Sequence, residues 1–269
     1  TSLRVSPRAE EVVRDLMGRA AGNMAWSTGV AAHVLHLAPA PSSAWNHAVT
    51  LQVAMEVRNL SQALAERQLA LLPTGAHPFM DPRKETIIWK DEQTTWLERA
   101  IGSDQHGWGN SQRALLELPF SSDEAFTKLH TALRMVVPIL PALAASSPWL
   151  EGVRSSTLDG ALMSHMAQGD RMPALVGQFI PPSIIGQEEY YREILEPIAL
   201  GMAGLEAPHS LDHQALNRHA IVARFDRNSI LVHVADQQEC VAADAAIAEI
   251  TVAVTRAMVQ GRWVSNYLQ

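Results

Sequence analysis

Three short stretches of the sequence combine charged or polar side chains with glycine and proline. They read PTGAHPFMDPRKETIIW at 73–89, QHGWGNSQ at 105–112 and RFDRNSILVHVADQQEC at 224–240. Each places Arg, Asp, His or Asn beside a residue that fixes the backbone, and such loops often hold a side chain in position for recognition. The three stretches are therefore the candidate parts of a small-molecule site.

Histidines raise a second possibility, a metal site. His209 and His213 are four residues apart and His219 follows, so two imidazoles could lie on one helical face. No HExxH pattern or nearby cysteine supports this. Neighbouring proline and serine instead indicate a loop. His33 and His36 lie in an apolar segment, where hydrogen-bonded core or surface histidines are commoner than ligands.

Other catalytic patterns receive little support. The chain has no GxxxxGK[ST] or GxGxxG loop for phosphates and no GxSxG nucleophile elbow. Cys240 is a possible nucleophile, but a lone cysteine before an alanine-rich segment is typically a small buried residue.

Composition narrows the class of protein. The 269 residues are 47% hydrophobic with a net charge of −7, and no cluster of lysine and arginine forms a basic stripe. Nucleic acid and anionic membranes are therefore not expected as partners. The longest apolar run, 135–145, is too short to span a bilayer and is expected to be a buried helix end. With one cysteine and no signal-peptide pattern, a cytoplasmic location is expected.

Periodicity predicts the elements that must position these residues. Helices are expected over 7–19, 45–70, 187–204 and 242–260, the last ending at Gly261, and 25–38 is either strand or helix. A strand over 110–120 ends at Pro119, and Ser121 with Glu124 has capping-box spacing for a following helix of about four turns. Residues 148–186 are expected to be a long irregular excursion or lid.

The strand at 229–235 alternates with a period of two. Ile230, Val232 and Val234 form an apolar face, whereas Leu231 and His233 lie on a mixed face. Strands separated by long helices, without regular alternation, predict an α+β fold with helices packed on an antiparallel sheet. One domain over residues 1–269 is the simplest organisation.

Together the three stretches, with WSTGVAAHVLHL, LPF at 118–120 and PALAASSPWLEG at 141–152, resemble the glutamate-cysteine ligase family of the second type, the carboxylate-amine ligases. The resemblance covers nearly the whole chain and implies a glutamine-synthetase-like fold, a cupped antiparallel sheet with helices outside. It also implies ATP and Mg²⁺ as cofactors, used to activate a carboxylate as an acyl phosphate. Carboxylates in the cup would hold the metal.

This sequence departs from the family pattern at the positions that the resemblance assigns to the cup. Leu231 stands in the place of a glutamate and His233 in that of an arginine. The strand before LPF has Leu115 and Glu117 in place of a histidine and an asparagine or second histidine. Further replacements stand at Gly29 and His36, where acids are expected, and near Ala161, where an arginine is expected. The sequence also begins just beyond the place of the family's glutamate-rich first strand, so either that strand precedes the sequence given or the protein lacks it.

Three functions remain open. The first is a pseudoenzyme that has lost ligase activity and forms a homo-oligomer, or a hetero-oligomer with an active ligase, because a missing first strand would expose a sheet edge. The second is an active ATP- and Mg²⁺-dependent ligase whose missing strand comes from upstream residues or from another subunit, with Glu117 as a weak metal ligand. The third is an amino-acid binding module. The residues expected to line the substrate or nucleotide pocket are His77, Arg83, Glu85, Asn110, Arg224, Arg227 and His233.

Overall fold

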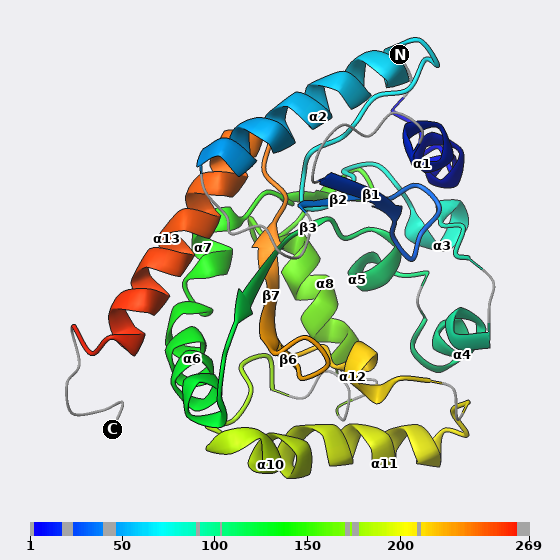
Figure 1. Ribbon diagram of the computed structural model, residues 1–269. Coiled ribbons are helices and arrows are strands. Elements are labelled where there is room, and N and C mark those ends of the chain that lie inside the picture. Colours follow the sequence, from blue (N-terminus) through cyan, green and yellow to red (C-terminus); the bar gives the residue numbers. More distant parts are fainter. Residues whose placement is uncertain are drawn as a thin grey trace.

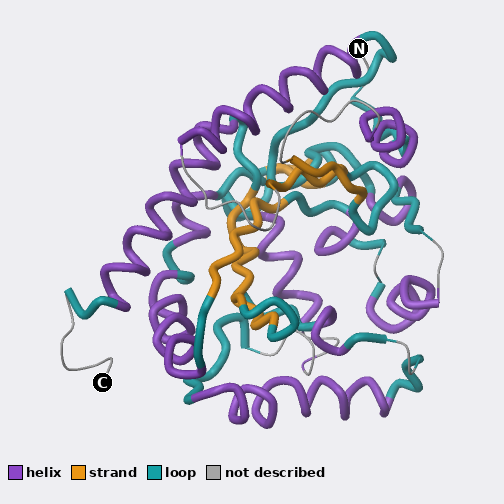
Figure 2. The backbone as a smooth tube through the Cα atoms, viewed as in Figure 1, coloured by secondary structure: helices purple, strands orange, loops and turns teal. Residues whose placement is uncertain are grey.

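The computed structural model describes residues 3–17, 24–39, 47–89, 92–102, 104–169, 173, 178–208 and 211–262. Its central feature is an antiparallel sheet with the strand order β3 (Arg113–Pro119), β7 (Ser229–Asp236) and β6 (Ile221–Arg224). Helices surround this sheet (Figures 1 and 2). The predicted α+β class with antiparallel strands is confirmed.

The apolar face of β7 packs on the largest hydrophobic core. Ile230, Val232 and Val234 are 0%, 2% and 2% exposed. They belong to one cluster with residues of α6 (Asp123–Val136) and α13 (Val241–Val259), and these two helices lie beside each other along one side of the sheet in Figure 1. The alternation in the sequence therefore identified the core face correctly.

The opposite face of β7 carries Leu231 and His233. Leu231 pairs with Glu117 of β3, so these two side chains share a face. Further along the strand, the ring of His233 lies 6.1 Å from that of His165, which comes from α8 (Gly160–Gly169). Helices therefore cover both faces of this sheet. Helices α6 and α13 pack on the apolar face, and α8 packs on the mixed face near His233.

Two segments differ from their expected structure. Residues 25–38 form neither one strand nor one helix but a hairpin of β1 (Met24–Thr28) and β2 (Leu35–Pro39). The expected irregular excursion contains the short hairpin β4–β5 (Trp149–Leu150 and Val153–Arg154) and the helix α8. The Asp159 carboxylate accepts a hydrogen bond from the backbone of Leu162 at 2.8 Å, which satisfies a free N–H group in the first turn of α8.

The start of α6 is displaced by one residue from its predicted cap. Ser122, not Ser121, has the extended backbone of an N-cap and accepts from the backbone N of Ala125 at 3.1 Å. Glu124 therefore lies in the first turn, where its carboxylate binds Lys128 at 2.7 Å. The helix has the expected length of about four turns.

The remaining helices pack around these layers. They are α1 (Ala9–Met17), α2 (His47–Ala65), α3 (Pro82–Glu85), α4 (Glu92–Ile101), α5 (His106–Gly109), α7 (Leu140–Ala144), α10 (Gly186–Tyr190), a π-helical turn (Tyr191–Leu195), α11 (Glu196–Gly204) and α12 (His213–Leu216). The helices expected over 7–19, 45–70, 187–204 and 242–260 correspond to α1, to α2, to the run from α10 to α11 and to α13. The second ends at Ala65, before its expected end, and residues 18–19 and 45–46 lie outside the described residues. Gly261 has a φ of +67°, as expected for the residue that ends α13.

Of two predictions of burial, one was correct in part and the other was wrong. The run 135–145 forms the end of α6 and the separate helix α7; Val136, Val137, Leu140 and Ala144 are buried as expected, whereas Ile139 and Leu143 are 57% and 52% exposed. Cys240 is exposed, because it occupies the extended N-cap position of α13 instead of the core. None of the described helices has the length and hydropathy that a bilayer crossing requires.

Candidate functional site

The last residue of β7, Asp236, has a buried carboxylate. Asp236 is 0% exposed. Its Oδ2 accepts hydrogen bonds from the backbone N of Ser146 at 3.0 Å and from the hydroxyl of Ser147 at 2.7 Å. Its Oδ1 lies 2.9 Å from the Arg113 guanidinium. The carboxylate is thus held by the adjacent Arg113 guanidinium and by two hydrogen-bond donors.

A second carboxylate lies beside this pair. Asp159 is 7% exposed, and its Oδ1 lies 4.0 Å from Arg113. Burial, followed by the charge of Asp236, raises the pKa of Asp159. One guanidinium therefore lies between two buried acids. We call Asp236, Arg113, Asp159, Ser146 and Ser147 the carboxylate hub.

The hub joins distant parts of the sequence. The backbone N of Gly75 donates to Ser146 Oγ at 2.9 Å, and Thr74 Oγ1 donates to the Ser146 carbonyl at 2.6 Å. A Cβ atom at Gly75 would lie 2.1 Å from the Asp236 carboxylate carbon. The TGAHP, ASSP and ADQQE strings therefore meet here, and only glycine leaves room for the acid.

His77 and Asn110, two of the predicted pocket residues, do lie together. Asn110 is fully buried; its Oδ1 accepts from the backbone N of His77 at 2.6 Å and its Nδ2 donates to the His77 carbonyl at 3.0 Å. His77 Nδ1 in turn accepts from the backbone N of Met80 at 3.0 Å. Burial lowers the pKa of His77. The polar atoms of the pair thus hold the loop before α3.

The other two predicted residues near this loop have different environments. Glu85 Oε2 accepts from the backbone N of Asp81 at 2.9 Å, so it supports the N-terminus of α3. Arg83 is exposed and lines a hollow of about 260 Å³ between α3, α5 and α8. Of these four predicted residues, Arg83 lines this hollow and His77, Glu85 and Asn110 do not.

Glu117, Arg224 and Arg227 lie at the opposite end of the sheet. Glu117 accepts from Ser229 at 2.5 Å and pairs with Arg227 at 3.3 Å. Arg224 pairs with Asp226 at 3.0 Å, and hydrogen bonding to Arg224 lowers the pKa of Asp226. We call these residues the surface pairs. Because β7 rises about 3.3 Å per residue, its two ends lie roughly 20 Å apart, so the predicted residues do not form one pocket.

His233, the last predicted residue, lies between the two ends. Its Nε2 lies 2.5 Å from the carbonyl of His219, and burial lowers the pKa of His233 to about 3. Next to it are His165 and Arg218, whose guanidinium carbon lies 3.9 Å from the ring centroid of Trp108. Sequence patterns did not single out Arg218, His165, Arg113 or Asp159, because residues far apart in the chain surround each of them.

Four of the positions that depart from the family pattern, Leu115, Leu231, Ala161 and Gly29, carry no side-chain oxygen or nitrogen that could bind a metal. Leu115 is 55% exposed, and Leu231 lies opposite Glu117 on the same face. Ala161 is fully buried, and its backbone N donates to Ser147. A side chain at Gly29 would meet Val34 at 2.9 Å. Within the described ranges no three His, Cys, Asp or Glu residues gather as a metal ion would require.

The histidines considered as alternative metal ligands are only partly described by the structure. His209 and the side chain of His213 lie outside the described residues. His219 is buried, with its Nδ1 at 2.7 Å from Asn217 Oδ1. His33 is largely buried and its pKa is lowered by burial, as is that of His36 in the β1–β2 hairpin. His33 and His36 therefore fit the interpretation as structural histidines.

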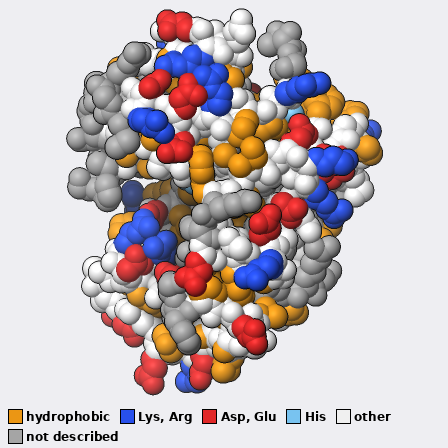
Figure 3. All heavy atoms as spheres, turned by 90° about the vertical axis from the view of Figure 1, so that its right-hand side faces the viewer, with side chains coloured by type: hydrophobic (Ala, Val, Ile, Leu, Met, Phe, Trp, Pro, Cys, Tyr) orange, Lys and Arg blue, Asp and Glu red, His pale blue; other side chains and the backbone are white. Residues whose placement is uncertain are grey.

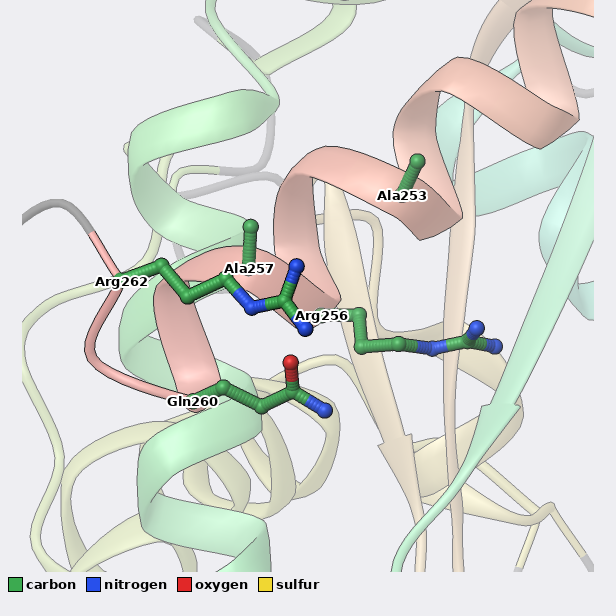
Figure 4. Close-up of a pocket in the computed structure, with 5 residues that line it drawn as sticks. All are labelled: Ala253, Arg256, Ala257, Gln260 and Arg262. Atoms are coloured by element: carbon green, nitrogen blue, oxygen red, sulfur yellow. The ribbon is translucent and has the colours of Figure 1, made fainter.

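A second hollow, of about 360 Å³, lies elsewhere. It is formed at the end of α13 by Ala253, Arg256, Ala257, Gln260 and Arg262 (Figure 4). None of the predicted site residues lines it. On the face seen in Figure 3, acidic and basic side chains are interspersed without a basic stripe.

Comparison with known proteins gives two matches. Residues 1–265 match the family model described as glutamate-cysteine ligase family 2. A protein of Archaeoglobus fulgidus, described as uncharacterized, is 30% identical over 190 residues. The aligned region covers 70% of this chain and 51% of that protein, so the match spans about half of its length.

Proposed function

Because the chain belongs to glutamate-cysteine ligase family 2, we propose that it is a non-catalytic member of that family. In this proposal it has lost ATP-dependent ligase activity and acts as a subunit or partner of an active ligase. The observation that carries the proposal is the environment of Glu117. This acid faces Leu231 across the strands, and its carboxylate is bound by Arg227 and Ser229.

The chemistry of this family requires a bound Mg²⁺ ion, and the described residues on this face of the sheet do not provide the ligands for it. Mg²⁺ binds several hard oxygen ligands in near-octahedral geometry, and phosphoryl transfer uses it to neutralise developing charge. Leucine offers no such ligand. A single carboxylate that already neutralises a guanidinium would have to give up that pair before it bound a metal. We therefore derive no step of metal–nucleotide chemistry on this face.

Calorimetric titration of the purified protein with Mg-ATP tests the proposal. We expect no saturable heat and no release of ADP when glutamate and an amine acceptor are added. Micromolar binding together with glutamate-dependent ADP release would instead establish an active ligase. The mass of the natively purified complex, with identification of any chain that co-purifies, tests the partner role; a solitary monomer would contradict it.

Binding of an amino acid is a second candidate, supported by the hollow beside Arg83. This hollow also contains Glu151, whose carboxylate lies 2.9 Å from Nε2 of His106. A cationic and an anionic side chain on the walls of one hollow could match the two charges of a zwitterion. Equilibrium dialysis with free amino acids, comparing the wild type with Arg83→Met, distinguishes this function from a purely structural one.

A further inference from the structure

The outer face of α13 carries an acid and a cation, Glu249 and Arg256, that have no ion-pair partner among the residues that the structure describes. Both side chains are exposed. They lie seven residues apart, which is about 10.5 Å along a helix, so they cannot pair with each other. Seven residues make nearly two turns, so both side chains lie on the same side of the helix. A molecule that binds this face therefore has to offer one cation and one acid with the same spacing.

The same face carries an exposed apolar side chain and an open hollow. Ile250 is 49% exposed and does not line the hollow. The hollow, of about 360 Å³, includes Ala253 and Ala257, which project from the same side of α13 (Figure 4). A branched apolar side chain and a hollow lined by two methyl groups are complementary. Both belong to one helix, so a second molecule is needed to bring them together.

We propose that a second copy of this chain binds the face, with the two α13 helices antiparallel in a symmetric dimer. A two-fold axis between Val252 and Ala253 places Glu249 of each copy level with Arg256 of the other. The same axis places Ile250 level with the midpoint between Ala253 and Ala257 of the second copy. One register therefore forms two reciprocal ion pairs and fills both hollows.

The two flanks of the face also match under this symmetry. At about 100° per residue, Glu249 and Arg256 lie on one flank of the exposed face, and Ile250 and Ala257 lie on the other. A two-fold axis perpendicular to both helices brings each flank against the same flank of the second copy. The charged groups therefore meet charged groups, and the apolar groups meet apolar groups.

The helices beside α13 also carry exposed large apolar side chains. Leu51 and Met55 of α2, Met135 of α6 and Leu143 of α7 are all more than half exposed. All three helices contact α13, which forms an outer edge of the molecule in Figure 1. Exposed apolar groups that lie close together mark protein interfaces, and charged pairs among them fix the register more than the affinity. This interface goes beyond the proposed function, because it joins two identical chains and involves no active ligase.

Sedimentation equilibrium of the purified full chain tests the interface through its charges. We expect the wild type to have the mass of two chains. Arg256→Glu brings two acids level with each other at both ion pairs, so it should weaken association about 100-fold or more. The double variant Glu249→Arg with Arg256→Glu exchanges the partners and should restore the dimer. Arg14→Glu is the matched control, because Arg14 is 72% exposed on α1, across the molecule from α13 in Figure 1; it should associate as the wild type does.

Disulfide cross-linking tests the register. The background is Cys240→Ser, because Cys240 is exposed. Ala253→Cys places the two thiols on either side of the axis, within reach of a disulfide. Ala246→Cys, at another exposed position of α13, places them about 20 Å apart. We therefore expect a covalent dimer from the first variant and none from the second.

Four results would overturn the proposal. They are a wild-type monomer at every concentration measured, a dimer that Arg256→Glu leaves unchanged, a double variant that stays monomeric, and cross-linking at position 246 equal to that at 253. None of them decides the proposed function, which is tested by Mg-ATP binding and by co-purification of a different chain. A wild-type monomer that co-purifies with such a chain would support the partner role and exclude this interface.

Discussion

The two ends of β7 use the same types of charged residue in opposite ways. At one end, Asp236 and Arg113 are paired inside the carboxylate hub, where their side chains are 0% and 12% exposed. At the other, Glu117 and Arg227 are paired in solvent, with side chains 37% and 53% exposed. The N–O distances, 2.9 and 3.3 Å, differ little. The exposure of each pair to solvent, more than its N–O distance, therefore determines how much the pair contributes to stability.

Water explains the difference. It solvates the separated charges of an exposed pair, so forming that pair changes the free energy little. A buried pair has lost that solvation, and removing one partner leaves the other charge without compensation. The hub should therefore behave as a structural unit that fixes three distant loops, whereas the surface pairs should contribute little to stability.

Replacing the central acid of the hub gives the largest expected effect. Asp236→Asn keeps the size of the side chain but leaves Arg113 without its closest counterion, so the free energy of unfolding should fall by about 3 to 5 kcal/mol. The matched control is Asp226→Asn in the surface pairs, with an expected loss below about 1 kcal/mol. Urea unfolding monitored by circular dichroism measures both. Equal losses in the two variants would contradict the comparison.

Lowering the pH tests a second feature of the protein interior, the buried and uncharged ring of His130. His130 is 0% exposed with no hydrogen-bond partner at either ring nitrogen, and burial lowers its pKa to about 3. The unfolded chain takes up a proton near pH 6.5, whereas the folded chain does not. Stability from this group is therefore complete above pH 6.5 and is lost as the pH falls toward 3, by about 2 kcal/mol at pH 5.

His130→Phe removes that titration and keeps an aromatic ring beside Phe126 and Tyr190. The variant should therefore lose less stability between pH 7.5 and pH 5 than the wild type. Urea unfolding at the two pH values gives the difference. Parallel losses in the two proteins would mean that the buried ring is not neutral in the folded state, or that the unfolded chain does not take up the proton.

The sequence predicted the elements better than the site. Periods of 2 and 3.6 residues report which face of a strand or helix is buried, so β7 and α1 were found from local patterns. The predicted pocket residues are not gathered in one place, and Glu85 and Asn110 satisfy backbone groups of nearby loops. Arg224 and Arg227 lie at the end of β7 opposite to Asp236. A sequence motif does not show how far apart a strand places the residues at its two ends.

The hub and Arg218 illustrate what the sequence leaves open. Asp236 lies in the quoted ADQQE string, but its counterion Arg113 is 123 positions away and its serine donors come from a third segment. Such a contact depends on the register of β3 against β7, in which Arg113 faces Asp236. Arg218 has no acid among the influences that shift its pKa. The residues next to it in the sequence do not show this, because its neighbours in the fold come from distant parts of the chain.

The smallest expected effect concerns Glu117. Glu117→Gln removes the charge that pairs with Arg227 but leaves an oxygen that can accept from Ser229, so the free energy of unfolding should change by less than about 1 kcal/mol. Raising the salt concentration should shrink even that change, because solvent ions screen exposed pairs. Urea unfolding at low and high salt measures it. A loss as large as that of Asp236→Asn, unaffected by salt, would show that Glu117 belongs to a buried network and would remove the contrast between the ends of β7.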